Sequence, residues 1–340
     1  MIDQKKNTYL SYWILLITLL VAIMIIVGGL TRLTDSGLSI TKWDLFTGII
    51  PPINKNKWEL AFSLYKEIPE FKLLNSSMTL NEFKTIFWWE YIHRLLGRLV
   101  GVLYLLPLIY FMFTKTIKKK DLLIFYLIFA LICFQGFIGW YMVKSGLVER
   151  TGVSQYRLSL HLTTAFIIYI FLFLIYLKTI NTKHLNNLKK LPYKMSYILI
   201  FLIVLQISLG AFVSGLDAGK IYQSWPLMSG NFFPNDSIVK SLFSLRFFDE
   251  PSLVQFMHRN IAYLILIFFS FIAYFVYSKD YFLHLRKAVL LISITLFIQI
   301  VLGILTLLSG AQIILASMHQ IGSIFLISAS LNLFFKDSKS

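Results

Sequence analysis

Four histidines occur in two matched pairs along this chain. His93 recurs as His258, 165 positions later, and His161 recurs as His319, 158 positions later. All four lie in apolar segments, where an ionisable side chain is costly and therefore a functional candidate by default. Each pair offers two imidazoles and no usable cysteine, whereas zinc needs three or four nitrogen or sulfur ligands. Two imidazoles on opposite faces of a haem iron fit the pattern better, so we expect His93 with His161, and His258 with His319, to bind haem.

Arginines accompany the histidines. Arg94 follows His93, Arg259 follows His258, and Arg98 lies one helical turn beyond Arg94. Guanidinium groups pair with carboxylates in a bidentate manner, which makes the haem propionates plausible ligands. The alternative is that these long side chains reach along the helices toward the membrane interface.

One titratable group distinguishes the two halves. Glu90 precedes His93 by three residues, so on a helix it faces the same side, and Gln255 occupies the matching position before His258. A redox carrier needs no carboxylate beside its haem, whereas a site that deprotonates water or substrate does. We therefore predict Glu90 as the catalytic residue. In the alternative reading, Glu90 caps the N-terminus of a helix that His93 opens.

The whole chain is a tandem repeat. Gly28, Asp35 and Gly37 recur as Gly210, Asp217 and Gly219, each 182 positions later. Because both copies have four helices, they run in the same direction across the membrane. This predicts a pseudo-two-fold axis along the membrane normal, with four-helix halves at 1–180 and 181–340. The paired Gly and Asp residues predict helix caps and tight turns, with a lid over each site as the alternative.

The composition is that of an all-α membrane protein. Hydrophobic residues make up 57% of the 340 residues, and the mean hydropathy is +0.73. A helix needs about 20 apolar residues to cross the hydrocarbon core. The sequence predicts eight such spans, at 12–33, 92–114, 121–143, 158–178, 196–214, 256–278, 286–308 and 312–335.

Charge placement predicts the topology. The net charge of +16 is concentrated in alternate loops and both termini, which are therefore cytoplasmic, and it indicates anionic lipid rather than nucleic acid as the partner. The long loop at 34–91 then faces outside, and its segment 54–81 looks partly helical and amphipathic. The single cysteine, Cys133, is expected to be a small buried residue of the third span.

Taken together, these motifs resemble the haem A synthases along nearly the whole chain. The resemblance rests on the opening GGLTRLTDSGLS, the sequences EYIHR at 90–94 and QFMHR at 255–259, and the late His319-Gln320. It implies a bacterial inner-membrane oxidoreductase that converts haem O to haem A, for terminal oxidase assembly, by successive hydroxylation of a ring methyl to a formyl group. His93 and His161 would bind the substrate haem near the periplasmic side, His258 and His319 would bind a haem b cofactor, and Glu90 would be catalytic.

The chain lacks the cysteine pair that some bacterial members carry in outer loops, so it resembles the cysteine-free proteobacterial and mitochondrial branch. The electron acceptor, a homo-oligomeric state and docking of the haem O synthase stay open. Two other functions fit the pattern less well. A diheme b-type cytochrome that carries electrons would leave Glu90 without a purpose. A transporter would place charged residues at mid-bilayer, whereas the polar cluster here lies at the outer ends of the spans.

Overall fold

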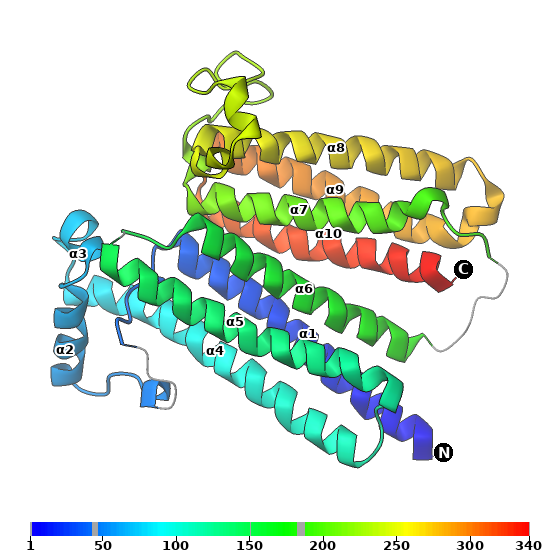
Figure 1. Cartoon of the computed structure of the whole chain (residues 1–340), viewed down its shortest axis with the longest axis horizontal. Helices are drawn as coiled ribbons and strands as arrows, with labels where there is room; N and C mark the ends of the chain where they lie inside the picture. The colour runs from blue at the N-terminus through cyan, green and yellow to red at the C-terminus, as the bar shows by residue number, and fades with distance from the viewer. Residues whose placement is uncertain (1, 43–46, 150, 182–187, 340) are drawn as a thin grey trace. The chain divides into compact units, whose positions relative to one another are not determined.

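The computed structural model describes residues 2–42, 47–149, 151–181 and 188–339. The described residues form α-helices joined by loops and short 3₁₀ turns, and eight helices are long and apolar enough to cross a membrane (Figure 1). All eight predicted spans are thereby confirmed. The membrane helices are α1 (Ile2–Leu33), α4 (Leu80–Phe113), α5 (Leu122–Glu149), α6 (Gln155–Ile180), α7 (Met195–Gly215), α8 (Pro251–Tyr277), α9 (Leu283–Leu308) and α10 (Ile313–Lys339).

The chain divides into two compact units. One unit comprises Leu19–Ile168, and the other comprises Met1–Thr18 with Tyr169–Ser340. The first contains His93 and His161, and the second contains His258 and His319. The division by repeat at 180/181 and the pseudo-two-fold axis stay predictions, and residues 182–187 near that boundary lie outside the described part of the chain.

An aromatic segment at residues 54–79 covers one end of the first unit, and we call it the outer segment because the charge pattern predicts that it faces outside. It holds the two short helices α2 (Lys55–Tyr65) and α3 (Pro69–Leu74), which confirms the helical character expected at 54–81. Phe62 and Tyr65 pack against Phe83 of α4, at ring-centroid distances of 5.0 and 5.2 Å. This packing ties the outer segment to the helix that carries His93.

Helix α4 begins earlier than the apolar pattern predicts. Thr79 and Glu82 form a reciprocal capping box, in which each side chain accepts a hydrogen bond from the other residue's backbone N–H. The cap places the helix start at Leu80, so the outer loop ends at 79 rather than 91. The first turns of α4 pack against the outer segment. Aromatic side chains, rather than lipid, therefore surround them.

In the second unit, α7 packs against α8 and α10, and α9 packs against α8 and α10 (Figure 1). A buried carboxylate fixes the end of this bundle that carries the C-terminus. Asp337 of α10 accepts hydrogen bonds from the backbone N–H of Leu191 and from the hydroxyl of Ser196. The start of α7 is thereby held against the last turn of α10.

The repeated turns are helix ends, as the Gly and Asp pattern predicts. Asp35 and Asp217 both adopt the left-handed backbone conformation, with φ of 48° and 51°. They lie at the same place after α1 and α7, and each forms an ion pair with a nearby basic residue, Arg32 or Lys220. Aspartate is one of the few residues other than glycine that adopts this conformation readily.

The expected burial of Cys133 is wrong. Its side chain is exposed on α5. Within a membrane the outward face of a helix is as apolar as its inward face, so hydrophobic surroundings in the sequence do not distinguish the two.

Candidate haem sites

The structure brings the predicted histidine pairs together. The ring centroids of His93 and His161 are 6.5 Å apart, and those of His258 and His319 are also 6.5 Å apart. A ring nitrogen binds a metal ion at about 2 Å, so two imidazoles on opposite sides of one ion have centroids roughly 6 Å apart. Each pair therefore has the separation that a shared iron atom requires.

A glycine lies against every one of these imidazoles. A Cβ on Gly28 would lie 2.9 Å from Cε1 of His93, and one on Gly303 would lie 2.9 Å from Cε1 of His319. Gly139 and Gly210 take the same position against the other two rings, at 3.4 Å and 3.2 Å. A side chain at Gly28 or Gly303 would force the ring to move, whereas Gly210 is only tight and Gly139 is at ordinary contact distance. In each pair, the two histidines and the two glycines come from four different helices.

One ring nitrogen of each histidine makes no hydrogen bond within the described part of the chain. In all four, Nδ1 is buried and has no hydrogen-bond partner among the described residues, while the residue as a whole stays partly accessible. Three of the four backbone carbonyls are held from a neighbouring helix, because Gln135 donates to His161, Gln299 to His319 and Gln206 to His258.

Glu90 clamps the outer loop in the first unit. Its carboxylate accepts hydrogen bonds from the hydroxyl of Ser39 and the backbone N–H of Ile40, both at 2.7 Å. The other oxygen forms an ion pair with Arg94 at 2.6 Å; the Glu90 side chain is buried and the Arg94 side chain is 9% exposed. Arg94 in turn donates to the carbonyls of Ile40 and Lys42. The loop main chain is thus held over the His93 site by one acid and one base.

The second unit repeats this clamp without the acid. Arg259 donates to the carbonyl of Tyr222, and so does the side-chain amide of Gln255. Tyr222 lies 182 positions after Ile40, so the two arginines bind equivalent main-chain groups. The carboxylate is what separates the two sites.

Arg259 still has capacity for an anion. Its Nε and Nη1 are buried without a hydrogen-bond partner among the described residues. Buried guanidinium donors are costly to leave unpaired, and a carboxylate is their natural partner. The donor set therefore fits a haem, whose iron the histidines would bind and whose propionate Arg259 would bind.

Two details of the predicted site are corrected by the fold. Glu90 does not cap a helix, and His93 does not open one, because α4 begins ten residues before Glu90, at Leu80. The capping explanation for Glu90 is therefore wrong. The structure also adds contacts that the sequence did not predict, namely the main-chain carbonyls of Ile40 and Tyr222 and the amide of Gln206.

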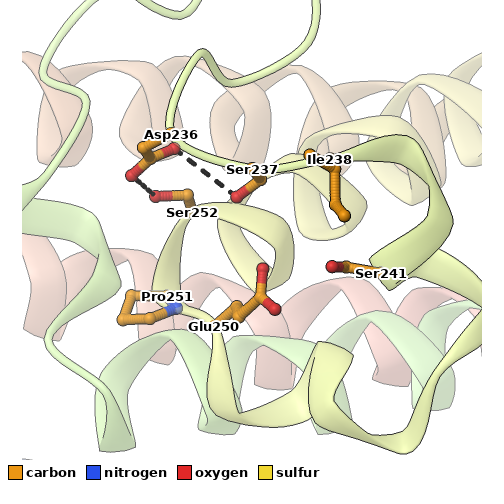
Figure 2. Close-up of a pocket in the computed structure, with 7 residues that line it drawn as sticks. All are labelled: Asp236, Ser237, Ile238, Ser241, Glu250, Pro251 and Ser252. Carbon is orange, nitrogen blue, oxygen red and sulfur yellow. Dashed lines mark hydrogen bonds between the residues drawn. The ribbon is translucent and has the colours of Figure 1, made fainter.

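A polar cavity of about 290 Å³ lies apart from the histidines, in the outer loop of the second unit (Figure 2). Asp236 lines it and accepts hydrogen bonds from the hydroxyls of Tyr222 and Ser252. Burial acts to raise the pKa of Asp236, but the hydrogen bonds from Ser252 and Tyr222 outweigh it and lower the pKa. Asp236 thus holds Tyr222, whose carbonyl Arg259 binds.

The amino-acid sequence of the chain matches a known protein family. The model of the cytochrome oxidase assembly protein family, COX15-CtaA, matches residues 11–331. The chain belongs to this family. The match spans all four histidines, Glu90, Arg94 and Arg259.

Individual relatives are similar over nearly their whole length. A protein named haem A synthase from Pelagibacter ubique is 48% identical, over 97% of this chain and 97% of its own. Haem A synthases from Rickettsia bellii and Bartonella tribocorum are 47% and 44% identical, over 96% and 93% of this chain and 96% and 89% of their own.

Proposed function

We propose that this chain is a haem A synthase, which oxidises a ring methyl of haem O to the formyl group of haem A. Two matched imidazole pairs, each with the separation of a shared iron, carry the proposal. The family and the relatives named haem A synthase support it. Conversion of methyl to formyl proceeds by two hydroxylations and loss of water, so the protein is an oxidoreductase that acts on a C–H group.

The two sites would bind different haems. His93 and His161 would bind the substrate haem, and His258 and His319 would bind a resident haem b that supplies electron transfer. The assignment rests on Glu90, because the first site alone has a carboxylate beside its histidines, and Gln255 stands in its place in the second. Arg94 and Arg259 would hold haem propionates at the two sites.

Glu90 would handle the proton that oxidation of the substrate releases. Its carboxylate is held by Arg94, Ser39 and Ile40, so its oxygens have a fixed position close to the His93 turn. A positioned carboxylate accepts a proton more readily than bulk water does. Once protonated, it would bind Arg94 less strongly, which would loosen the outer loop.

The orientation follows from the loops. Both sites lie at the helix ends that meet the long outer loops, since Arg94 and Arg259 bind main-chain carbonyls of those loops. With the basic loops and both termini cytoplasmic, we place the haems near the periplasmic side of a bacterial inner membrane. Haem O would enter from the lipid phase, and the electron acceptor is unidentified.

The test is the haem content of membranes from cells that make haem O, with and without this chain, by chromatography and mass spectrometry. We expect haem A or its hydroxylated intermediate only when the chain is present. Glu90→Gln should abolish haem A while the purified protein still binds haem. The control is Glu59→Gln, an exposed carboxylate of α2, which should leave haem A at the unmodified level.

Two outcomes would overturn the proposal. Unchanged haem O together with two haems b in the purified protein would identify an electron-transfer cytochrome. Full haem A output from the Glu90→Gln protein, at normal haem content, would remove Glu90 from the reaction.

A further inference from the structure

The four histidine-bearing turns are not held equally. Gln135 donates to the backbone carbonyl of His161 at 2.8 Å, and Gln299 donates to that of His319 at 2.9 Å. These two glutamines are repeat partners and serve the second histidine of each pair. Gln206 donates to the carbonyl of His258 at 2.9 Å. Three of the four ligand turns are therefore tied to a neighbouring helix by an amide.

His93 lacks this tie. The position that corresponds to Gln206, 182 residues earlier, is Met24. A thioether cannot donate a hydrogen bond, and no side chain of the described residues donates to the carbonyl of His93. The Met24 methyl instead lies 3.6 Å from where a Cβ on Gly97 would be, one turn beyond His93. The turn of His93 is thus packed by a flexible apolar side chain where its counterpart is hydrogen-bonded.

Gln206 also reaches the ring of its histidine. Its amide nitrogen lies 3.3 Å from Nε2 of His258, in addition to its bond to the carbonyl. One side chain thereby restrains both the main chain and the imidazole of His258. Iron bound at Nε2 would take the lone pair that the ring contact uses, so the bond to the carbonyl is the restraint that would persist beside a haem. That restraint suits a ligand that is never released, because it holds the turn in place to return a released imidazole to the iron.

The two sites have opposite needs, given the proposed function on which this inference rests. A resident cofactor must stay, whereas haem O must enter and haem A must leave, so a substrate-site ligand must release its iron. We propose that His93 is that exchangeable ligand, and that Met24 in place of a glutamine is what leaves it exchangeable. On release the iron–nitrogen bond breaks, the imidazole keeps its electron pair, and the iron keeps its oxidation state.

The test is a reciprocal exchange in the full chain, Met24→Gln and Gln206→Met. Carbon monoxide binds a ferrous bis-histidine haem only after one histidine leaves, so its binding rate reports ligand release. Gln206→Met protein from cells without haem O should bind carbon monoxide about fivefold faster at its remaining haem, the factor expected from one hydrogen bond. Met24→Gln protein loaded with haem O should bind it about fivefold more slowly at that haem.

Two further measurements keep the result interpretable. Met24→Leu removes the sulfur without adding a donor and should match the unmodified chain. All variants should keep the ferric spectrum of a low-spin, six-coordinate haem, which separates ligand release from unfolding. Equal rates for Met24→Gln and Met24→Leu, or an unchanged rate for Gln206→Met, would overturn the inference. Failure of the proposed function would show differently, as no haem O bound by the unmodified chain.

Discussion

Two buried carboxyl groups distinguish the first half of the chain at the scale of single residues. Glu90 forms an ion pair with Arg94. Removing one member of such a buried pair lowers the free energy of unfolding by about 3–5 kcal/mol, because the other charge is left buried without a partner. Glu70 of α3 has no ion-pair partner among the described residues, and its side chain accepts a hydrogen bond from the hydroxyl of Tyr65, at 2.9 Å. Asn75 donates to the same hydroxyl.

Burial raises the pKa of Glu70 from its ordinary value of 4.5 to about 7. The hydrogen bond from Tyr65 and the charge of Arg32 act against this rise, while Asp35 and Glu90 add to it. Between these two pH values the folded protein binds more protons than the unfolded chain. The stability of the outer segment must therefore fall as the pH rises from about 4.5 to about 7.

We predict that the detergent-solubilised protein unfolds at a lower temperature at pH 8 than at pH 5.5. Glu70→Gln should remove most of that difference and stabilise the protein at pH 8, by on the order of 3 kcal/mol. Differential scanning fluorimetry at the two pH values measures both. The control, Glu59→Gln at an exposed position, should leave the difference in unfolding temperature between the two pH values unchanged. The same difference in the Glu70→Gln protein as in the unmodified chain would contradict the prediction.

At the scale of elements, glycine and histidine form one packing unit across two helices. Gly303 of α9 faces His319 of α10, and a Cβ there would approach Cε1 to 2.9 Å. An added methyl must push the ring away from its position. Overpacking of this kind costs about 1–3 kcal/mol, more than the roughly 1 kcal/mol that alanine gains over glycine in a helix.

Gly303→Ala should therefore lower both the haem bound per chain and the unfolding temperature, as measured by absorbance and calorimetry. Gly136→Ala on α5 serves as the control, because nothing lies within 4 Å of a Cβ at that position. The control should keep its haem and unfold at the same temperature or slightly higher. Full haem occupancy in the Gly303→Ala protein would show that the ring can move without loss of binding.

The elements were predictable to different degrees for physical reasons. The eight spans follow from apolar length alone, and the histidine pairs follow from the repeat. The true start of α4 at Leu80 was missed because aromatic packing and the Thr79 cap, rather than lipid, stabilise its first turns. Cys133 was misplaced because lipid-facing and buried surfaces have the same composition.

At the scale of the whole molecule, the same arrangement of residues occurs in both compact units. Each unit contains its own imidazole pair, glycine contacts and arginine clamp. Beside the histidines, the two sites differ at Glu90 against Gln255 and at Met24 against Gln206. A duplicated scaffold that diverges at single side chains should let each site be removed without loss of the other.

We predict that His258→Ala loses most of the haem bound by protein from cells without haem O, while His93→Ala retains it. Removing one axial ligand should affect only its own site, because each pair lies within one compact unit. Haem and protein content of the purified variants give the answer. Equal losses in the two variants would mean that the resident haem depends on both sites.

The arginine clamps have a consequence for how this molecule can change over time. Arg94 and Arg259 bind main-chain carbonyls, and the residues that carry those carbonyls are an isoleucine and a tyrosine. Every amino acid has a carbonyl, so the side chain at position 40 is free to vary while the anchor persists. Tyr222 is constrained further, because its hydroxyl donates to Asp236. Comparison of loop sequences should then show more variability at position 40 than at position 222, although both carbonyls anchor a loop.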